Sequence, residues 1–392
     1  MSTLIQRAST ANKAAKEARV KLPPQGRYDK TLFVVAISLA VFGVIMVYSA
    51  SSYAAARNHG DRLFFVYKQL VGVIGGIAVM VILSRIDYGL FRKLTIPILL
   101  VSIGLLVIVL IPGIGMEVYG ARRWIRLPFF TLQASEVSKF GFVLFAAIYM
   151  SKHYKRMNTL RGIIPVLAIG GLMCILIMLE PNMSITMVVG LTMLLMLFIG
   201  GMKISHFVIL ALPLAALVPV LIIMEPYRLA RLAAFVNPWA NPLEEGFQLI
   251  QSFYSLGSGG LFGVGLFNSR QKYLFLPFSE SDFIFSIIGE ELGLIGALMV
   301  IAAFVLLIIR AVKIARNSRD RLGAYMASGI ACLIAIQVIV NIAVVTGSIP
   351  PTGLPLPFIS AGSSSLIVFL GSIGILQSIS RHGKGYMHRR RV

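Results

Sequence analysis

The sequence predicts an all-α polytopic membrane protein with ten transmembrane helices and a large extracellular loop between helices seven and eight. Apolar segments of about 17–25 residues, the length that a bilayer demands, recur along the chain. Only 13% of the 392 residues are charged and the mean hydropathy is +0.86, whereas about a quarter of the residues of a soluble domain are charged. The net charge of +21 fits the excess of Lys and Arg that fixes membrane topology, so no nucleic-acid partner is expected.

The chain divides into a basic cytoplasmic tail at residues 1–30, expected to be disordered, a membrane domain at 31–380, and a second basic cytoplasmic tail at 381–392. The first apolar segment is itself long enough to span a bilayer, so it is not a cleavable signal peptide. The predicted spans are 31–51, 67–84, 94–112, 137–151, 162–179, 184–201, 204–224, 283–310, 323–346 and 362–380.

The distribution of charge predicts the orientation. With the N-terminus placed in the cytoplasm, 25 of the 36 Lys and Arg residues lie on the cytoplasmic side, which supports a cytoplasmic N-terminus and C-terminus. Only 4 of the 15 acidic residues lie there. Acidic residues contribute little to topology, so a functional site at the outer face is one explanation for their bias.

Three outer segments are irregular: residues 112–136, residues 225–281 and residues 348–366. The second is long for a loop, and such loops are usually functional or disordered. Its glycines, aromatics and short apolar patches favour ordered re-entrant or interfacial structure. Backbone of this kind is tolerated near membrane depth only where it is buried in protein or lines a wet cavity. The three segments therefore predict one shared cavity at the outer face.

Asp282 begins the apolar run DFIFSIIGEELGLIG and is the first candidate functional residue. Two interpretations stay open from spacing alone. Ser279, Ser281 and Asp282 could cap the following helix, or Asp282 could serve chemistry, since an ionisable residue at a membrane helix end is a functional candidate. A helix N-terminus lowers a carboxylate pKa, whereas burial in an apolar pocket raises it.

Two more groups of charged residues lie at membrane depth. Glu136 and Lys139 are three apart at a helix start, so their side chains can meet, either as a structural ion pair or as a polar wall of the cavity. At least one of Glu290 and Glu291 is expected to face into the bundle and to be paired there. A structural role for these two is favoured.

The loop SLGSGGLFGVGLFNSRQK is rich in glycine but no GK[ST] follows, so it is not a phosphate-binding Walker loop. Close backbone packing or a tight turn is favoured, with an approach of a phosphate group to Arg270 and Lys272 as the alternative. Cys174 and Cys332 lie in apolar runs and are expected to be buried hydrophobes. The five histidines are scattered, so no metal site is predicted from them.

Six blocks in order resemble the motifs of the SEDS family (shape, elongation, division and sporulation), whose members include FtsW, RodA and SpoVE. They are MVYSAS (46–51), KQL (68–70), RRWI (122–125), QASEVSK (133–139), the block 251–292, and TGLPLPFISAGSSS (352–365). The N-terminal tail and the first helix favour the FtsW/SpoVE branch. The chain departs from the family in reading PFSESDFIF for PExxTDFIF, which puts Phe278 where a glutamate is usual, and in reading EPNMSI for QPDLGT, which puts Asn182 in place of an aspartate.

The resemblance implies a peptidoglycan glycosyltransferase, an inverting enzyme that polymerises lipid II at the outer face of the bacterial cytoplasmic membrane. It also implies a class b penicillin-binding protein transpeptidase as partner, with other divisome proteins and membrane lipids around it. Asp282 matches the family's essential aspartate, and Glu136 with Lys139 matches its glutamate–lysine pair. The expected substrate-binding residues are Arg122, Arg123, Glu136, Lys139, Arg228, Arg231, Gln251, Ser252, Lys272, Ser363 and Ser364.

The expected reaction has Asp282 as the general base and cations on the departing diphosphate. No cofactor is required by the sequence, and a divalent cation, Mg or Mn, stays open as one of those cations. A lipid II transporter is the main rival, since intramembrane carboxylates and broken segments suit transport. The polar residues cluster at the outer end and not at the midplane, which favours the enzyme. A scaffold that only recruits partners is a third alternative.

Overall fold

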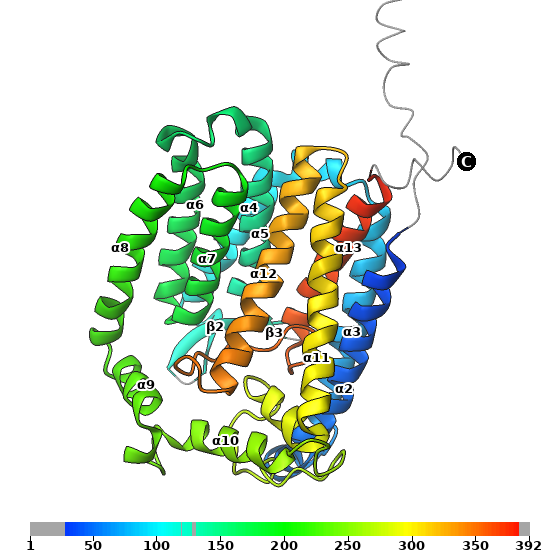
Figure 1. Ribbon diagram of the computed structural model, residues 1–392, viewed down its shortest axis with the longest axis vertical. Helices are drawn as coiled ribbons and strands as arrows, with labels where there is room; N and C mark the ends of the chain where they lie inside the picture. The colour runs from blue at the N-terminus through cyan, green and yellow to red at the C-terminus, as the bar shows by residue number, and fades with distance from the viewer. Residues whose placement is uncertain (1–27, 119, 128–130, 384–392) are drawn as a thin grey trace, which may run out of the picture.

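A computed structural model describes residues 28–118, 120–127 and 131–383 as a bundle of long helices, with a small sheet and two shorter α-helices at one end (Figure 1). The α-helices are α2 (Lys30–His59), α3 (Phe64–Arg85), α4 (Phe91–Leu110), α5 (Ala134–His153), α6 (Leu160–Leu179), α7 (Met183–Ile199), α8 (Ile204–Ile223), α9 (Pro226–Val236), α10 (Phe247–Gly259), α11 (Ile284–Arg316), α12 (Arg321–Val345) and α13 (Ser363–Arg381). Three short 3₁₀ helices join them, η1 (Tyr88–Leu90), η2 (Tyr154–Arg156) and η3 (Pro238–Ala240).

Each of the ten predicted apolar segments overlaps one of the long helices α2–α8 and α11–α13. Within the described residues, seven helices are long and apolar enough to cross a membrane, so the chain is a multi-pass membrane protein. These seven are α2, α3, α4 with η1, α6, α11, α12 and α13. Helices α7 and α8 are also apolar, but shorter by that measure, and α5 carries three charged side chains (Glu136, Lys139 and Lys152). The count of ten crossings stays a prediction.

The two described ends of the chain lie at the same end of the bundle. Gln377, near the end of α13, donates through Nε2 to the Asp29 carbonyl at 2.9 Å and accepts from the Asp29 amide at 2.8 Å. The Asp29 carboxylate also accepts from Leu32 N and pairs with Arg310 of α11. An even number of crossings places both ends on one side, as the sequence predicts. The predicted tails fall almost wholly outside the described residues.

The first outer segment folds into a small antiparallel sheet, which corrects the expectation of an all-α protein. Its strands are β1 (Gly115–Val118), β2 (Ala121–Arg126) and β3 (Thr131–Gln133), in the order β1-β2-β3. Trp124 in the central strand pairs with Met116 on one side and with Gln133 on the other. Because β3 ends at Gln133 and α5 begins at Ala134, the sheet fixes the entry of α5 into the bundle.

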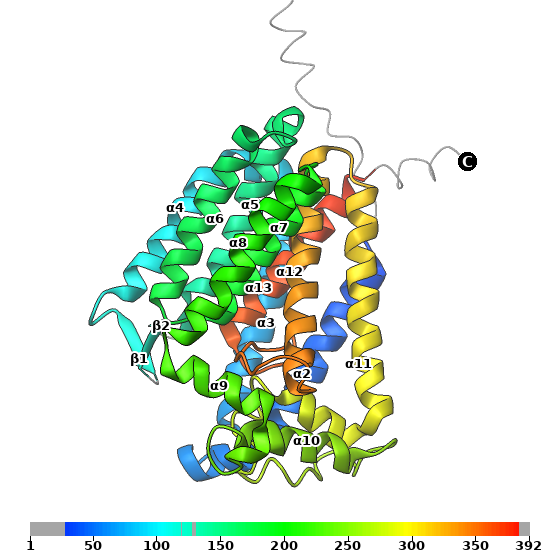
Figure 2. The same ribbon diagram turned by 60° about the vertical axis from the view of Figure 1, so that its left-hand side comes forward.

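The long segment between α8 and α11 is ordered, as predicted, and holds α9, η3 and α10. Pro226 at the first turn suits the start of α9, because that position has no intrahelical N–H bond to lose. Helices α9 and α10 lie with the sheet at the end of the bundle opposite residues 28 and 383 (Figure 2). Two of the three segments predicted to form the outer cavity therefore lie at one end of the molecule (Figure 2), and the cavity itself stays a prediction.

Helix α11 is broken at Gly293, whose backbone (φ 67°, ψ −170°) is not helical. The part before the break, residues 284–292, is called the half-helix below. Residues 294–316 alone extend about 35 Å at 1.5 Å per residue, which is enough to cross a bilayer. All residues of the half-helix except Leu292 are buried, so it is a core element of the bundle and not a lipid-facing span.

Candidate active site

Asp282 lies in a tight turn immediately before the half-helix. The turn is closed by Ser281 N and Phe283 N, which both donate to the Phe278 carbonyl, at 3.1 and 3.3 Å. Phe278 itself adopts the left-handed region (φ 54°). The helix begins at Ile284, and the preceding Phe283 provides no side-chain cap. The helix-cap interpretation of Asp282 is therefore wrong, because the turn places the carboxylate outside the capping position.

The irregular segment between α12 and α13 holds the backbone of this turn. Asn341 of α12 donates through Nδ2 to the carbonyls of Asp282 (2.8 Å) and Leu354 (2.6 Å). Ser360 Oγ donates to the Ser281 carbonyl at 2.5 Å, and Ala361 N donates to the Glu280 carbonyl at 2.9 Å. Asn341 and Ser360 therefore fix the Asp282 turn to the residues before α13.

The Asp282 carboxylate lies beside Gly353, where a methyl group on the glycine Cα would be 3.3 Å from Oδ2. Burial raises the pKa of Asp282 to about 6, Arg231 and Arg123 oppose that rise, and Glu280 adds to it. The side chain is still partly exposed. A carboxylate of this pKa is largely ionised at neutral pH and is a much better proton acceptor than an ordinary aspartate.

The two arginines that act on Asp282 come from separate elements. Arg231 of α9 donates through Nη1 to the Pro351 carbonyl at 3.1 Å. Arg123 of β2 donates through Nε to the Glu180 carbonyl at 3.0 Å and through Nη2 to the Pro181 carbonyl. Burial lowers the pKa of Arg123, although an arginine stays charged in proteins. The sheet and α9 thus bring two cations to one carboxylate.

Glu180 follows α6 and is fully buried, and neither of its carboxylate oxygens has a hydrogen-bond partner in the described structure. Burial raises the pKa of Glu180 to about 8, with the charge of Arg123 opposing the rise. Glu280 is half-buried, and burial also raises its pKa. Glu180 and Asp282 therefore both act electrostatically on Arg123, and Glu280 acts on Asp282. All three of these acidic groups have a raised pKa.

The predicted Glu136–Lys139 pair forms, and both side chains are fully buried in α5. Lys139 Nζ lies 2.8 Å from Glu136 Oε1 and 2.7 Å from Gln337 Oε1 of α12. Ser365 Oγ donates to the other Glu136 oxygen at 2.9 Å. Gln337 Nε2 in turn donates to the Pro355 carbonyl at 2.9 Å.

Gln337 and Asn341 lie one helical turn apart on α12 and bind the adjacent carbonyls of Pro355 and Leu354. The segment before α13 therefore joins the Glu136–Lys139 pair to the Asp282 turn. Sequence reasoning missed Gln337, Ser360 and Ser365. The available signal for Gln337 was its spacing of four from Asn341, which puts two amides on one face of an apolar helix.

The other predicted residues lie in several places. Arg122 pairs with Glu117 across the β1–β2 hairpin at 3.0 Å, and Arg228 of α9 approaches the Met178 sulfur at 3.6 Å. Ser252 of α10 is buried against Ser286 and the Val345 carbonyl, and Gln251 beside it is half-buried. Ser363 donates to the Lys68 carbonyl.

Ser364 accepts from Gln133 N, so it joins α13 to the end of β3. Lys272 is buried and paired with Glu291 at 3.2 Å, in a separate cluster from Asp282. That ion pair confirms the expectation that one carboxylate of the half-helix is paired inside the bundle.

Within the described residues, no three or more His, Cys, Asp or Glu side chains gather in a group that could hold a metal ion. Two arginines and Glu280 act on the Asp282 carboxylate, and Asn341 and Ser360 bind the backbone of its turn. This donor set suits an anionic, hydroxyl-bearing ligand.

The chain is similar to known proteins over most of its length. The chain is 42% identical over 90% of its length to a Trichlorobacter lovleyi protein named probable peptidoglycan glycosyltransferase FtsW, covering 93% of that protein. It is 40% identical over 91% of its length to stage V sporulation protein E of Bacillus subtilis, covering 98% of it. A chain of a solved peptidoglycan synthase complex superposes with a TM-score of 0.71 at 27% identity, over 90% of this chain and 98% of that one.

The rod shape determining protein RodA of Thermus thermophilus has the same fold, with a TM-score of 0.66 at 24% identity over 91% of this chain and 98% of that one. A family model described as cell cycle protein, covering FtsW, RodA and SpoVE, matches residues 29–385. The chain belongs to the FtsW/RodA/SpoVE family.

Proposed function

We propose that this protein is a peptidoglycan glycosyltransferase that polymerises lipid II, with Asp282 as the general base. The observation that carries the proposal is a partly exposed carboxylate with its pKa raised to about 6, bordered by Gly353 and under the influence of Arg123 and Arg231. The names of its relatives supply the reaction class. A general base works best when its pKa lies near the operating pH.

In the proposed reaction, a sugar hydroxyl of one lipid-linked disaccharide attacks the anomeric carbon of a second. A new glycosidic C–O bond forms as the bond from the anomeric carbon to the undecaprenyl diphosphate breaks, with inversion at that carbon. The proton of the attacking hydroxyl passes to the Asp282 carboxylate. The bonding electrons leave with the diphosphate, so negative charge moves from Asp282 to the leaving group.

Cations must stabilise the departing diphosphate. Arg123 and Arg231 are the best placed, because they approach Asp282 from two sides and are anchored on backbone carbonyls. Arg122 and Arg228 lie on the same two elements and form the outer part of the proposed site. The charges of Lys139 and Lys272 are instead compensated by Glu136 and Glu291.

A divalent cation stays an open component of this proposal. The described residues do not assemble a site with three or more protein ligands of the usual kinds. No step of the mechanism above is derived through a metal, and the roles of Asp282 and the arginines do not depend on one.

We also propose that the N-terminus and C-terminus are cytoplasmic and that the site faces outward, where lipid II is consumed. The positive charges favour this orientation. The likeness to a chain of a peptidoglycan synthase complex supports a class b penicillin-binding protein as partner. A cysteine placed at Gly120 in the hairpin would be labelled by a membrane-impermeant reagent in intact cells. Protection there, with labelling only after lysis, would reverse the orientation.

The function is tested by polymerisation of purified lipid II with the full-length protein, with and without the partner transpeptidase. Asp282→Asn is expected to lower glycan synthesis by at least a hundredfold while the protein stays folded. Asp61→Asn is the matched control, because it is the same chemical change in the exposed loop between α2 and α3. An Asp282→Asn protein that polymerises lipid II at the normal rate would overturn the base assignment.

A lipid-flipping assay on the same preparations separates the enzyme from a transporter. The proposal expects Asp282→Asn to abolish polymerisation in detergent, where no second leaflet exists. A wild-type protein that moves lipid II between leaflets but makes no glycan in either setting would favour the transporter instead.

A further inference from the structure

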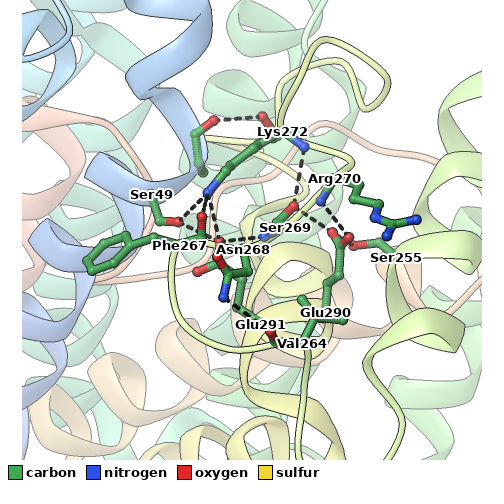
Figure 3. Close-up of polar contacts among 12 residues, drawn as sticks. Ser49, Ser255, Val264, Phe267, Asn268, Ser269, Arg270, Lys272, Glu290 and Glu291 are labelled. Atoms are coloured by element: carbon green, nitrogen blue, oxygen red, sulfur yellow. Dashed lines mark hydrogen bonds and ion pairs between the residues drawn. The ribbon is translucent and has the colours of Figure 1, made fainter.

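The polar cluster around Glu290 and Glu291 lies apart from the proposed active site and has no role in the mechanism above. It gathers side chains and backbone from α2, α10, the loop after α10 and the end of the half-helix (Figure 3). Both carboxylates are almost completely buried. Burying two adjacent acidic side chains is costly unless they are paired and hydrogen-bonded. Partners reach both oxygens of Glu290 and one oxygen of Glu291, while Glu291 Oε2 has no hydrogen-bond partner among the described residues.

The loop after α10 supplies most of the partners. Glu291 Oε1 accepts from Ser269 N at 3.2 Å, from Lys272 Nζ at 3.2 Å and from Ser49 Oγ of α2 at 2.6 Å. Glu290 accepts from Ser269 Oγ at 2.6 Å, from Arg270 N at 2.8 Å and from Ser255 Oγ of α10 at 3.2 Å. The two carboxylates therefore hold the 269–272 segment against the end of the half-helix.

The same loop also fills the break in α11. The carbonyls of Glu290 and Glu291, left open by the break, accept from Val264 N at 3.0 Å and Gly265 N at 3.0 Å. The amides of Leu294 and Ile295, at the start of the next part, donate to the Gly260 and Leu261 carbonyls. Residues 260–265 thus replace the backbone hydrogen bonds that a continuous helix would make.

The ion pair closes a ring of chain around the proposed base. Lys272 and Glu291 are 19 residues apart, and Asp282 lies close to the middle of the segment between them. The chain runs from Lys272 through the turn to Asp282 and returns along the half-helix to Glu291. The half-helix is packed in the core, so a shift at Glu291 moves its first residue, Ile284, and with it the turn that holds Asp282.

Helix α2 contacts this ring of chain at two points. Ser49 donates to Glu291 at the base of the ring, and the neighbouring Ala50 carbonyl accepts from Ser279 Oγ, three residues before Asp282, at 3.3 Å. Edge-to-face ring contacts join Tyr48 to Phe267 and Tyr53 to Tyr273. Two adjacent residues of α2 therefore contact both the C-terminal end of the segment, at Glu291, and the part just before Asp282, at Ser279.

We propose that the Lys272–Glu291 ion pair is a clasp that positions Asp282 for proton transfer, so both are positioning residues and neither touches substrate. This inference rests on the proposed function of Asp282. Catalysis of this kind is sensitive to placement, since a displacement of about 1 Å can cost a hundredfold in rate. Opening the clasp is expected to lower kcat while leaving the substrate-binding arginines, and so KM, in place.

The test compares Lys272→Met and Glu291→Gln with Asp29→Asn in the full-length protein, with lipid II as the substrate. Asp29 pairs with Arg310 and is the matched control, because that ion pair also joins α2 to α11 but lies at the opposite end of the bundle. The two clasp variants are expected to lose at least tenfold in kcat with KM changed less than twofold, and Asp29→Asn less than threefold in kcat. Lys272→Arg keeps the positive charge but brings a larger, planar head group to a buried site, so it is expected to lose less in kcat than Lys272→Met.

Amide hydrogen exchange gives a readout that does not depend on activity. Faster exchange over residues 278–292 in the clasp variants, and not in Asp29→Asn, is the expected result. The proposal is overturned if kcat is unchanged in both clasp variants, if Asp29→Asn loses as much, or if exchange at 278–292 stays at the wild-type rate. An active Asp282→Asn protein would sink the proposed function but leave the exchange comparison valid, so the two failures are distinguishable.

Discussion

Among the described residues, two buried lysine–glutamate pairs have the same chemistry and different construction. Glu136 and Lys139 are three residues apart on one helix, and both are fully buried. Lys272 and Glu291 are 19 residues apart and join a loop to the end of a half-helix. The spacing of three on α5 brings the first pair together, and Gln337 and Ser365 complete its hydrogen bonds. The second pair forms only when the loop occupies the break in α11. The Glu136–Lys139 pair is therefore part of the helical core, whereas the Lys272–Glu291 pair depends on the position of a loop.

The sharpest test of this difference is to remove the lysine from each pair. Lys139→Met leaves Glu136 in the packed interior of α5, where the charge cannot reach water. We expect the free energy of unfolding to fall by about 3–5 kcal/mol and polymerisation to be lost. Lys272→Met leaves Glu291 beside a loop with exposed neighbours such as Tyr273 and Leu274, which can open locally. Denaturant unfolding in detergent measures both, and equal losses of global stability would remove the distinction.

The second test breaks the loop insertion without touching a charge. Gly263 has φ +82°, and a methyl group there would lie 2.1 Å from the Glu291 carbonyl oxygen. We expect Gly263→Ala to cost about 2–3 kcal/mol, through backbone strain and overpacking, and to lower kcat as the clasp variants do.

Gly257 is the control for that substitution, since a methyl group there meets no atom within 4 Å. Gly257→Ala lies in α10 and is expected to stabilise by about 0.5–1 kcal/mol, because alanine favours the helix. Thermal unfolding and the lipid II assay check both variants. If Gly263→Ala is as stable and active as Gly257→Ala, the loop does not need to sit in the break.

The third test uses Glu180, a buried carboxylate with no hydrogen-bond partner in the described structure. Its pKa is raised from 4.5 to about 8 in the folded protein, so the folded state holds the proton more tightly than the unfolded state. Stability is therefore lost as pH rises from about 4.5 to 8. Glu180→Gln is expected to gain about 1–2 kcal/mol over the wild type at pH 8 and nothing near pH 4. Unfolding measured at both pH values checks this, and a gain that is equal at both would contradict it.

The smallest expected effect concerns the acid limb of the pH–rate profile. The base must be ionised, so polymerisation is expected to fall as pH drops through about 6, the pKa of Asp282. Glu280→Gln removes a nearby negative charge and should move the limb down by about half a pH unit, while Arg231→Gln should move it up by a similar amount. Profiles of kcat/KM record the shift. If both substitutions move the limb the same way, another group controls it.

Hydropathy located the ten long helices because each is a long apolar run bounded by polar segments. It missed the sheet of β1–β3, whose strands are only three to six residues long and whose central strand contains three arginines. The pair Glu136–Lys139 was predictable from a spacing of three. The partners of Lys272 were not, because they depend on a loop entering a helix break. The hydrogen bonds that Asn341 and Gln337 donate to the carbonyls of Leu354 and Pro355 could not be predicted either, because they depend on the fold of the segment before α13.

The half-helix that follows Asp282 has only nine residues, and a helix of that length has little stability of its own in water. The Asp282 turn is fixed by Asn341 and Ser360. These two residues lie late in the chain and are therefore synthesised after the turn itself. During membrane insertion the proposed base therefore acquires its setting only after α12 and the segment before α13 have arrived. A chain truncated before Ser360 would hold nearly every other element of the site and still lack an organised Asp282, so polymerising activity reports that insertion is complete.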